Sequence, residues 1–215
     1  MGLGAFGTTL TTLSLSLMEW RGVKTENVFV CNFFFVGALG LVITAQWEQS
    51  VGNGFAYTVF SAFGELTAHL IYTLANTNHT GLFYAGFGAL LTPAFGISQA
   101  YGSDTTQYNN AVAFWMTLWT IFMFSFLIAS LSANIAYIIV FIFLVLGFLF
   151  VAASYYASAD GNAVAALALK KVGGAMCFVA GLTGWYIVFQ IFVKNELGFE
   201  LPLGDTSRNF KKKEL

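Results

Sequence analysis

The sequence predicts an all-α membrane protein, and two observations carry that prediction. Apolar residues make up 58% of the 215-residue chain and charged residues only 9%, against about 25% charged in an ordinary soluble domain. Between positions 28 and 193, charges are nearly absent and apolar residues run in blocks of about twenty. Such a block is what an α-helix needs to cross the hydrocarbon layer, because a helix satisfies its backbone polar groups without water.

Hydropathy marks seven candidate spans along the chain. The first ends at the interface cluster Glu19-Trp20-Arg21, and a turn at Gly52-Asn53-Gly54 follows the second. Only Ser132-Ala133 separates two long apolar runs, which predicts an antiparallel helical hairpin. Polar stretches at 101–110 and 158–171 are expected to be loops. The candidate spans are 3–18, 28–48, 55–75, 81–100, 112–131, 134–156 and 172–193.

The distribution of positive charge predicts how the chain is oriented in the membrane. The C-terminal end carries Arg208 and the run Lys211-Lys212-Lys213, so the positive-inside rule places it in the cytoplasm. We therefore expect a transmembrane helical domain at 1–194 and a cytoplasmic tail at 195–215. An even number of spans places the N-terminus in the cytoplasm as well, whereas seven spans do not.

Several function classes are disfavoured. A net charge of −1 provides no basic face for nucleic acid. No paired carboxylates at helical spacing, zinc-protease motif, nucleophile elbow or phosphate-binding loop is present, so we expect neither an enzyme nor a cofactor. His69 and His79 do not share one helical face, and no metal site is expected. Among the carboxylates, Glu65 alone falls well inside a predicted span, because Glu48 sits at the end of one.

Small residues predict helix packing. Gly173, Cys177 and Gly181 recur every four positions on the last span, a spacing that lets helix backbones approach closely. Packing is the favoured interpretation of these residues, and lining of a pore is the alternative. Cys31 and Cys177 lie on separate apolar runs and are interpreted as small packing residues.

Short motifs spread along the chain resemble the acetate uptake transporter family, which includes bacterial succinate–acetate permeases and fungal acetate and ammonia plasma-membrane proteins. The first is the run Gly2-Leu3-Gly4-Ala5-Phe6-Gly7-Thr8-Thr9, although the Asn-Pro-Ala-Pro that precedes it in the family is absent, which suggests a truncated start. The later motifs follow in the family's order: Glu48, Gly52-Asn53, Phe55, Phe63-Gly64, Leu118-Trp119, Phe122-Met123-Phe124, Ser130-Leu131, Gly161-Asn162, Trp185-Tyr186 and Leu201-Pro202-Leu203-Gly204-Asp205.

Residues 65–81 depart from the family pattern. They separate Phe63-Gly64 from the aromatic run that follows it directly in the family, and they end in a polar stretch. We hypothesise that this block is a translated intron, because its ends can be encoded by splice signals; sequencing the mature transcript tests this. Without the block, 55–64 continues at 82–92 as one helix. The expected fold is therefore a bundle of six transmembrane helices whose third helix is interrupted at about 65–81, and Glu65, His69 and His79 lose any functional claim.

The resemblance implies a function. It implies a homohexamer in the plasma membrane with both termini cytoplasmic. Each subunit then carries a narrow path, passive or proton-coupled, for acetate-like monocarboxylates. It places a constricting ring on Phe6, Phe63 and Leu144, with Phe63 where the family usually has Tyr. Thr8 and Thr9 are candidate pore-lining donors to a carboxylate. The alternatives are export of ammonia or ammonium, a non-conducting structural or signalling protein, and a purely packing role for the three ring residues.

Overall fold

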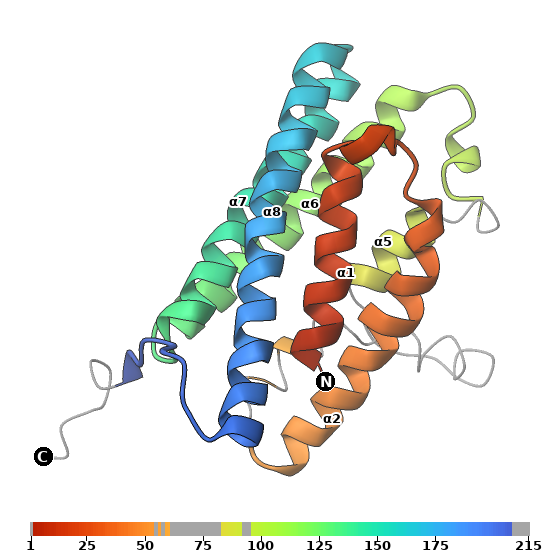
Figure 1. Ribbon diagram of the computed structural model, residues 1–215. Helices are drawn as coiled ribbons and strands as arrows, with labels where there is room; N and C mark the ends of the chain where they lie inside the picture. The colour runs from red at the N-terminus through yellow and green to blue at the C-terminus, as the bar shows by residue number, and fades with distance from the viewer. Residues whose placement is uncertain (1, 54–55, 57–58, 61–82, 92–95, 208–215) are drawn as a thin grey trace, which may run out of the picture.

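Long helices dominate the computed structural model, which describes residues 2–53, 56, 59–60, 83–91 and 96–207 (Figure 1). Short 3-10 or π turns separate or extend the helices, and the described residues contain no strand beyond one bridge between Asn134 and Asp205. The helices are α1 (Gly2–Leu17), η3 (Asn32–Leu39), α2 (Gly40–Ser50), α5 (Phe83–Leu91), α6 (Thr105–Ser130), α7 (Ile135–Ala159) and α8 (Ala163–Phe192).

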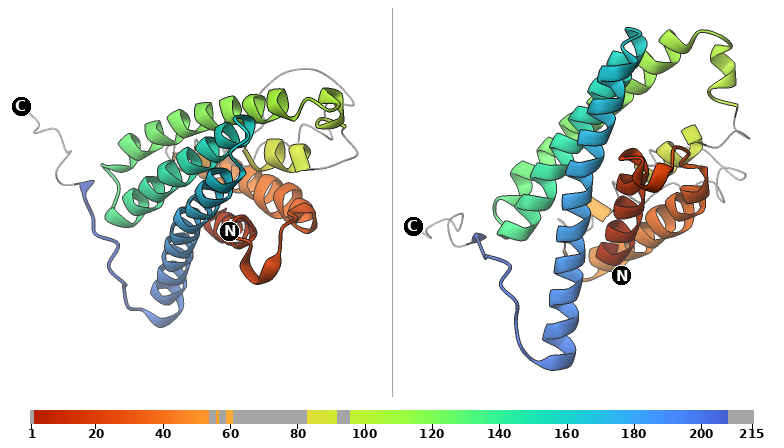
Figure 2. Two further views of the ribbon diagram at one scale, coloured as in Figure 1. Left: turned by 90° about the horizontal axis from the view of Figure 1, so that it is seen from above. Right: turned by 45° about the horizontal axis from the view of Figure 1, so that its top comes forward.

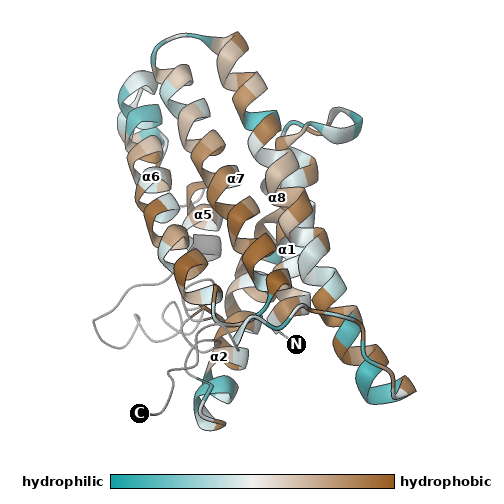
Figure 3. Ribbon diagram, turned by 90° about the vertical axis from the view of Figure 1, so that its left-hand side faces the viewer, coloured by the Kyte–Doolittle hydropathy of each residue, from teal (hydrophilic) through white to brown (hydrophobic). Residues whose placement is uncertain are grey.

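Three described helices are long and apolar enough to cross a membrane: α6, α7, and α8 with its π-helical continuation, Ala163–Leu197. Figure 3 shows an apolar band along them, with hydrophilic residues gathered toward the ends. The helical prediction is confirmed for the described residues. The interrupted third helix at 65–81 and most of the span expected at 55–75 lie outside them.

The predicted span boundaries hold at some helices and are wrong at α6, at α8 and for the span expected at 81–100, where residues 96–98 are not helical. α1 and α7 match their expected spans within three residues, and only residues 131–134 separate α6 from α7. However, α6 begins at Thr105 and α8 at Ala163, inside the stretches expected to be loops. Hydropathy marks where a helix leaves the lipid, whereas the helix itself ends where its backbone groups find another partner.

Capping side chains explain those two early starts. Oδ1 of Asp104 accepts a hydrogen bond from the N–H of Gln107 at 2.9 Å, and Oδ1 of Asn162 accepts one from the N–H of Ala165 at 3.1 Å. Asp and Asn are preferred at such positions because they satisfy N–H groups that have no partner inside the helix. The helices therefore extend into polar surroundings beyond their apolar blocks.

α8 is the common neighbour of α7 and α1. It packs along both, and α6 packs along the far side of α7, so that the order α6, α7, α8, α1 can be followed in Figure 2. A β-carbon added to Gly173 would lie 2.9 Å from the carbonyl oxygen of Gly147 on α7. One added to Gly181 would lie 2.7 Å from Oγ1 of Thr11 on α1. The glycine spacing thus serves helix packing, as predicted.

The chain that follows α8 returns to the start of α7. The N–H of Ile135 donates to the carbonyl of Gly204 at 2.8 Å, and the N–H of Ala136 donates to that of Leu203 at 3.2 Å. The Tyr186 hydroxyl donates to the carbonyl of Pro202 at 2.8 Å. Part of the segment interpreted as a tail therefore supplies acceptors to the N-terminus of a membrane helix.

Candidate functional site

Side chains, not backbones, fill the space between α1 and α7. Both helices pack on α8 but make few close backbone contacts with each other. Each presents a stripe of residues spaced three or four apart, the pattern of one continuous helical face, and on α7 Val140 lies beside this stripe. We call these two stripes the α1–α7 seam: Leu3, Phe6, Leu10, Leu13 and Leu17 on α1, and Tyr137, Val140, Phe141, Leu144, Phe148 and Val151 on α7.

The middle of the seam is closed. Leu10 and Leu144 are fully buried, and Leu13 and Phe148 are each 2% exposed. All four belong to one apolar core cluster. We call these four residues the plug. A closed apolar constriction excludes hydrated ions because it gives them no replacement for their water.

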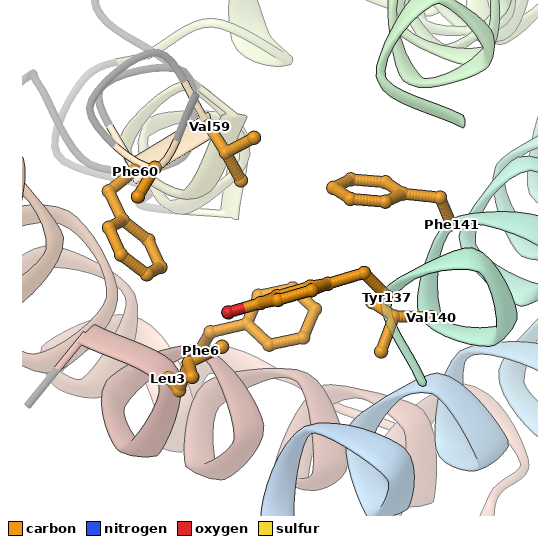
Figure 4. Close-up of a pocket in the computed structure, with 8 residues that line it drawn as sticks. Leu3, Phe6, Val59, Phe60, Tyr137, Val140 and Phe141 are labelled. Atoms are coloured by element: carbon orange, nitrogen blue, oxygen red, sulfur yellow. The ribbon is translucent and has the colours of Figure 1, made fainter. Parts of the chain in front are cut away.

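A small cavity lies at one end of the seam, which we call the Tyr137 cavity. Its volume is about 30 Å³, which is room for roughly two water-sized molecules. Seven of its eight lining residues are apolar, and Figure 4 shows the hydroxyl of Tyr137 directed into the space near Phe6 and Phe60. The lining consists of Leu3, Phe6, Ala56, Val59, Phe60, Tyr137, Val140 and Phe141.

The predicted ring is described in part. Phe6 is 5% exposed and lines the Tyr137 cavity, and Leu144 lies one helical turn beyond Val140 and Phe141, in the plug. Neither residue is on an outer face of the bundle. Phe63 lies outside the described residues, three positions beyond Phe60. The roles of all three as a constriction remain predictions.

The two candidate threonines differ. The Thr8 hydroxyl donates to the carbonyl of Gly4 at 2.8 Å, so its proton is used within its own helix. Thr9 is fully buried, and its hydroxyl has no hydrogen-bond partner in the described part of the chain. A buried hydroxyl without a partner is costly. Thr9, one turn along α1 from Phe6, is therefore the better candidate donor.

Tyr137 is a residue that sequence reasoning missed. At the edge of a long apolar block, a tyrosine is ordinarily an interfacial anchor. Its spacing of seven from Leu144 is the signal that could have found it, because residues seven apart share a helical face. Phe63 has no hydroxyl to offer a carboxylate, whereas Tyr137 on α7 brings one to this cavity.

Comparison with known proteins decides the family. The model of the GPR1/FUN34/yaaH family matches residues 1–78 and 71–203. The chain belongs to this family. The family resemblance is thereby confirmed, and with the apolar helices it makes the chain an integral membrane protein.

Named relatives include transporters of two kinds. The chain is 41% identical over 207 residues to acetate transporter protein patA of Penicillium expansum, covering 96% of this chain and 76% of that one. It is 40% identical over 208 residues to patA of Aspergillus clavatus, covering 97% and 77%. It is 27% identical over 186 residues to ammonia transport outward protein 2 of Saccharomyces cerevisiae, covering 86% and 57%.

The fold also has a counterpart among solved structures. The bacterial acetate channel SatP superposes with a TM-score of 0.68 at 20% identity, over 95% of this chain and 96% of that one. At this identity the likeness concerns the fold. It supports the arrangement of α1, α7 and α8 described above.

Proposed function

We propose that the chain is a transmembrane channel or transporter for acetate and similar small monocarboxylates. The observation that carries this proposal is the α1–α7 seam, a continuous apolar line closed by side chains and not by backbone. The two relatives named as acetate transporters support the choice of cargo. Six transmembrane helices in each subunit, residues 1–194 as the membrane domain, a homohexamer, the plasma membrane and cytoplasmic termini complete the proposal.

The apolar plug favours passage of the protonated, neutral form of a carboxylic acid. Taking acetate to ionise like a glutamate side chain, with a pKa of about 4.3, roughly one molecule in 500 is neutral at pH 7. An unpaired charge is strongly disfavoured in apolar surroundings, whereas the neutral acid needs only its hydrogen bonds replaced. Proton uptake before the plug, with the hydroxyls of Thr9 and Tyr137 as hydrogen-bonding groups, therefore lowers the barrier. Phe6, Phe63 and Leu144 are proposed as the constriction.

Ammonia is the second candidate cargo. It is small and uncharged in its basic form, so an apolar plug admits it on the same grounds as acetic acid. The relative named for outward ammonia transport supports this alternative. Comparing both cargoes in one preparation distinguishes them.

Uptake of labelled acetate into vesicles containing the purified full chain, corrected for empty vesicles, tests the proposal. Leu144→Trp fills the plug, and acetate uptake is expected to fall about tenfold or more, since 1.4 kcal/mol of added barrier slows crossing tenfold. Leu149→Trp makes the same substitution at a residue of α7 that is 50% exposed, and it should leave uptake unchanged. Uptake at the empty-vesicle level for the unmodified chain would instead indicate a non-conducting protein.

A further inference from the structure

A second cavity lies at the other end of the α1–α7 seam. Its volume is about 340 Å³, within the range of about 300–1,000 Å³ typical of small-molecule sites. Leu17 and Val151 connect it to the plug, because each follows a plug residue, Leu13 or Phe148, by one helical turn. We call it the Lys170 cavity: Leu17, Glu19, Val151, Ser154, Tyr155, Ser158, Ala163, Ala166, Leu167 and Lys170.

Polar groups distinguish this cavity from the one at Tyr137. The lining contains an ammonium group, a carboxylate, a phenol and two serine hydroxyls. The serine protons are used locally, since Ser154 donates to the carbonyl of Val151 at 2.7 Å and Ser158 donates to that of Ser154 at 2.9 Å. The groups able to donate to a carboxylate are therefore Lys170 and Tyr155.

An ion pair holds the Lys170 side chain in place but does not use all of its N–H donors. Its Nζ lies 2.9 Å from Oε1 of Glu26, and the two side chains are 30% and 12% exposed. The neighbouring pair, Lys171 and Glu19, lies at 3.1 Å. An ammonium group has three N–H donors, so the pair with Glu26 leaves two for another acceptor. Glu26 both orients the lysine and competes with an incoming anion.

We infer that the Lys170 cavity is a binding site for small monocarboxylate anions at the second mouth of the path. The inference rests on the proposed function and deepens it. At neutral pH nearly all of the cargo is anionic, and the plug rejects anions. A cation beside the plug raises the local concentration of carboxylate where it must take up a proton, with Lys170 contacting one oxygen and Tyr155 the other.

Two substitutions that break the same ion pair test this inference with opposite expected signs. Lys170→Gln removes the cation, so the acetate concentration at half-maximal flux should rise about fivefold, the effect expected of a partly exposed charge pair. Glu26→Gln removes the competitor but keeps the cation, so that concentration should fall about twofold. Maximal flux should change little in either variant. Lys194→Gln breaks an exposed pair with Glu200, outside the cavity, and serves as the control.

A purely structural ion pair would give both variants the same sign, which would overturn the inference. Raising the salt concentration provides a second measurement, because salt screens exposed charges. It should raise the half-maximal concentration of the unmodified chain but hardly change that of Lys170→Gln. If Lys170→Gln does not fold, an unchanged or raised value for Glu26→Gln still overturns the inference. Unchanged values together with a block by Leu144→Trp would refute this site alone, whereas absent flux in the unmodified chain refutes the proposed function as well.

Discussion

The two interfaces that α7 forms with its neighbours α8 and α1 are built on opposite principles. Against α8, Gly147 of α7 and Gly173 of α8 let the backbones touch, with Cys177 beside them. Toward α1, leucine and phenylalanine side chains keep the helices apart. Backbones in contact cannot separate without moving whole helices, whereas side chains between two helices can change rotamer while both helices stay in place. We call the α7–α8 interface the wall; under the proposed function, the α1–α7 seam is the interface that opens.

The largest expected effect comes from a substitution that overpacks the α7–α8 interface. Gly173→Ala would place a methyl group 2.8 Å from Cγ2 of Val151 and 2.9 Å from the carbonyl oxygen of Gly147. We expect the free energy of unfolding to fall by about 2 kcal/mol, as is typical of overpacking. Thermal unfolding of the detergent-purified protein measures this.

Gly4→Ala is the matched control for that prediction. Apart from the backbone of α1 itself, no atom of the described residues lies within 4 Å of the position that its β-carbon would occupy. Alanine should therefore stabilise α1 by about 0.5–1 kcal/mol, the usual difference from glycine within a helix. Shifts of the same sign in both variants would contradict the steric explanation of the effect at Gly173.

The second prediction sharpens the account of the seam. Tyr137→Phe removes one hydroxyl from the Tyr137 cavity and keeps the ring. The acetate concentration at half-maximal flux should rise about two- to tenfold, which corresponds to one hydrogen bond of about 0.5–1.5 kcal/mol. Initial rates of labelled acetate uptake measure it.

Tyr156→Phe is the control for Tyr137→Phe. The Tyr156 hydroxyl shares a hydrogen bond of 3.2 Å with Oγ1 of Thr117, between α7 and α6 and away from the seam. The same chemical change there should leave acetate uptake unaltered. Equal effects of both variants on uptake would show that Tyr137 acts through stability and not through the cargo.

The smallest effect concerns Cys177, whose side chain fills space at the α7–α8 interface. Cys177 is 1% exposed, whereas Cys31 is exposed. Cys177→Ala should lower the free energy of unfolding by about 1 kcal/mol, because the removed sulfur leaves a small void. Cys31→Ala should change it by less than about 0.5 kcal/mol, as surface substitutions do. A larger loss at Cys31 would mean that another surface covers it.

The sequence predicted the apolar part of the long helices and missed the polar turns at the start of α6 and α8. It located α7 well because that block is apolar almost throughout. It began α8 too late, at 172 and not at Ala163, because Lys170 and Lys171 interrupt the apolar run. The structure pairs these two lysines with Glu26 and Glu19, residues far away in the chain. No local pattern could have identified those partners.

The candidate site shows the same division. Phe6 and Leu144 were selected from the sequence through a family resemblance, and both lie in the seam. The roles given to Tyr137, to Thr9 (whose hydroxyl has no partner among the described residues) and to the Lys170 cavity depend on which faces of three helices meet. The helical period shows which residues share one face of a helix, but it does not show which other helix packs against that face.

By itself, the sequence determined that this chain lies in a membrane as a set of apolar helices, and it identified the family. The helices could be recognised because lipid constrains the local sequence in two ways. A span must be long enough to cross, and its backbone must form its hydrogen bonds internally. Only the tertiary structure decided which interface is a wall and which is a seam. That choice depends on whether glycines or large side chains of two helices face each other, and those helices are distant in the chain.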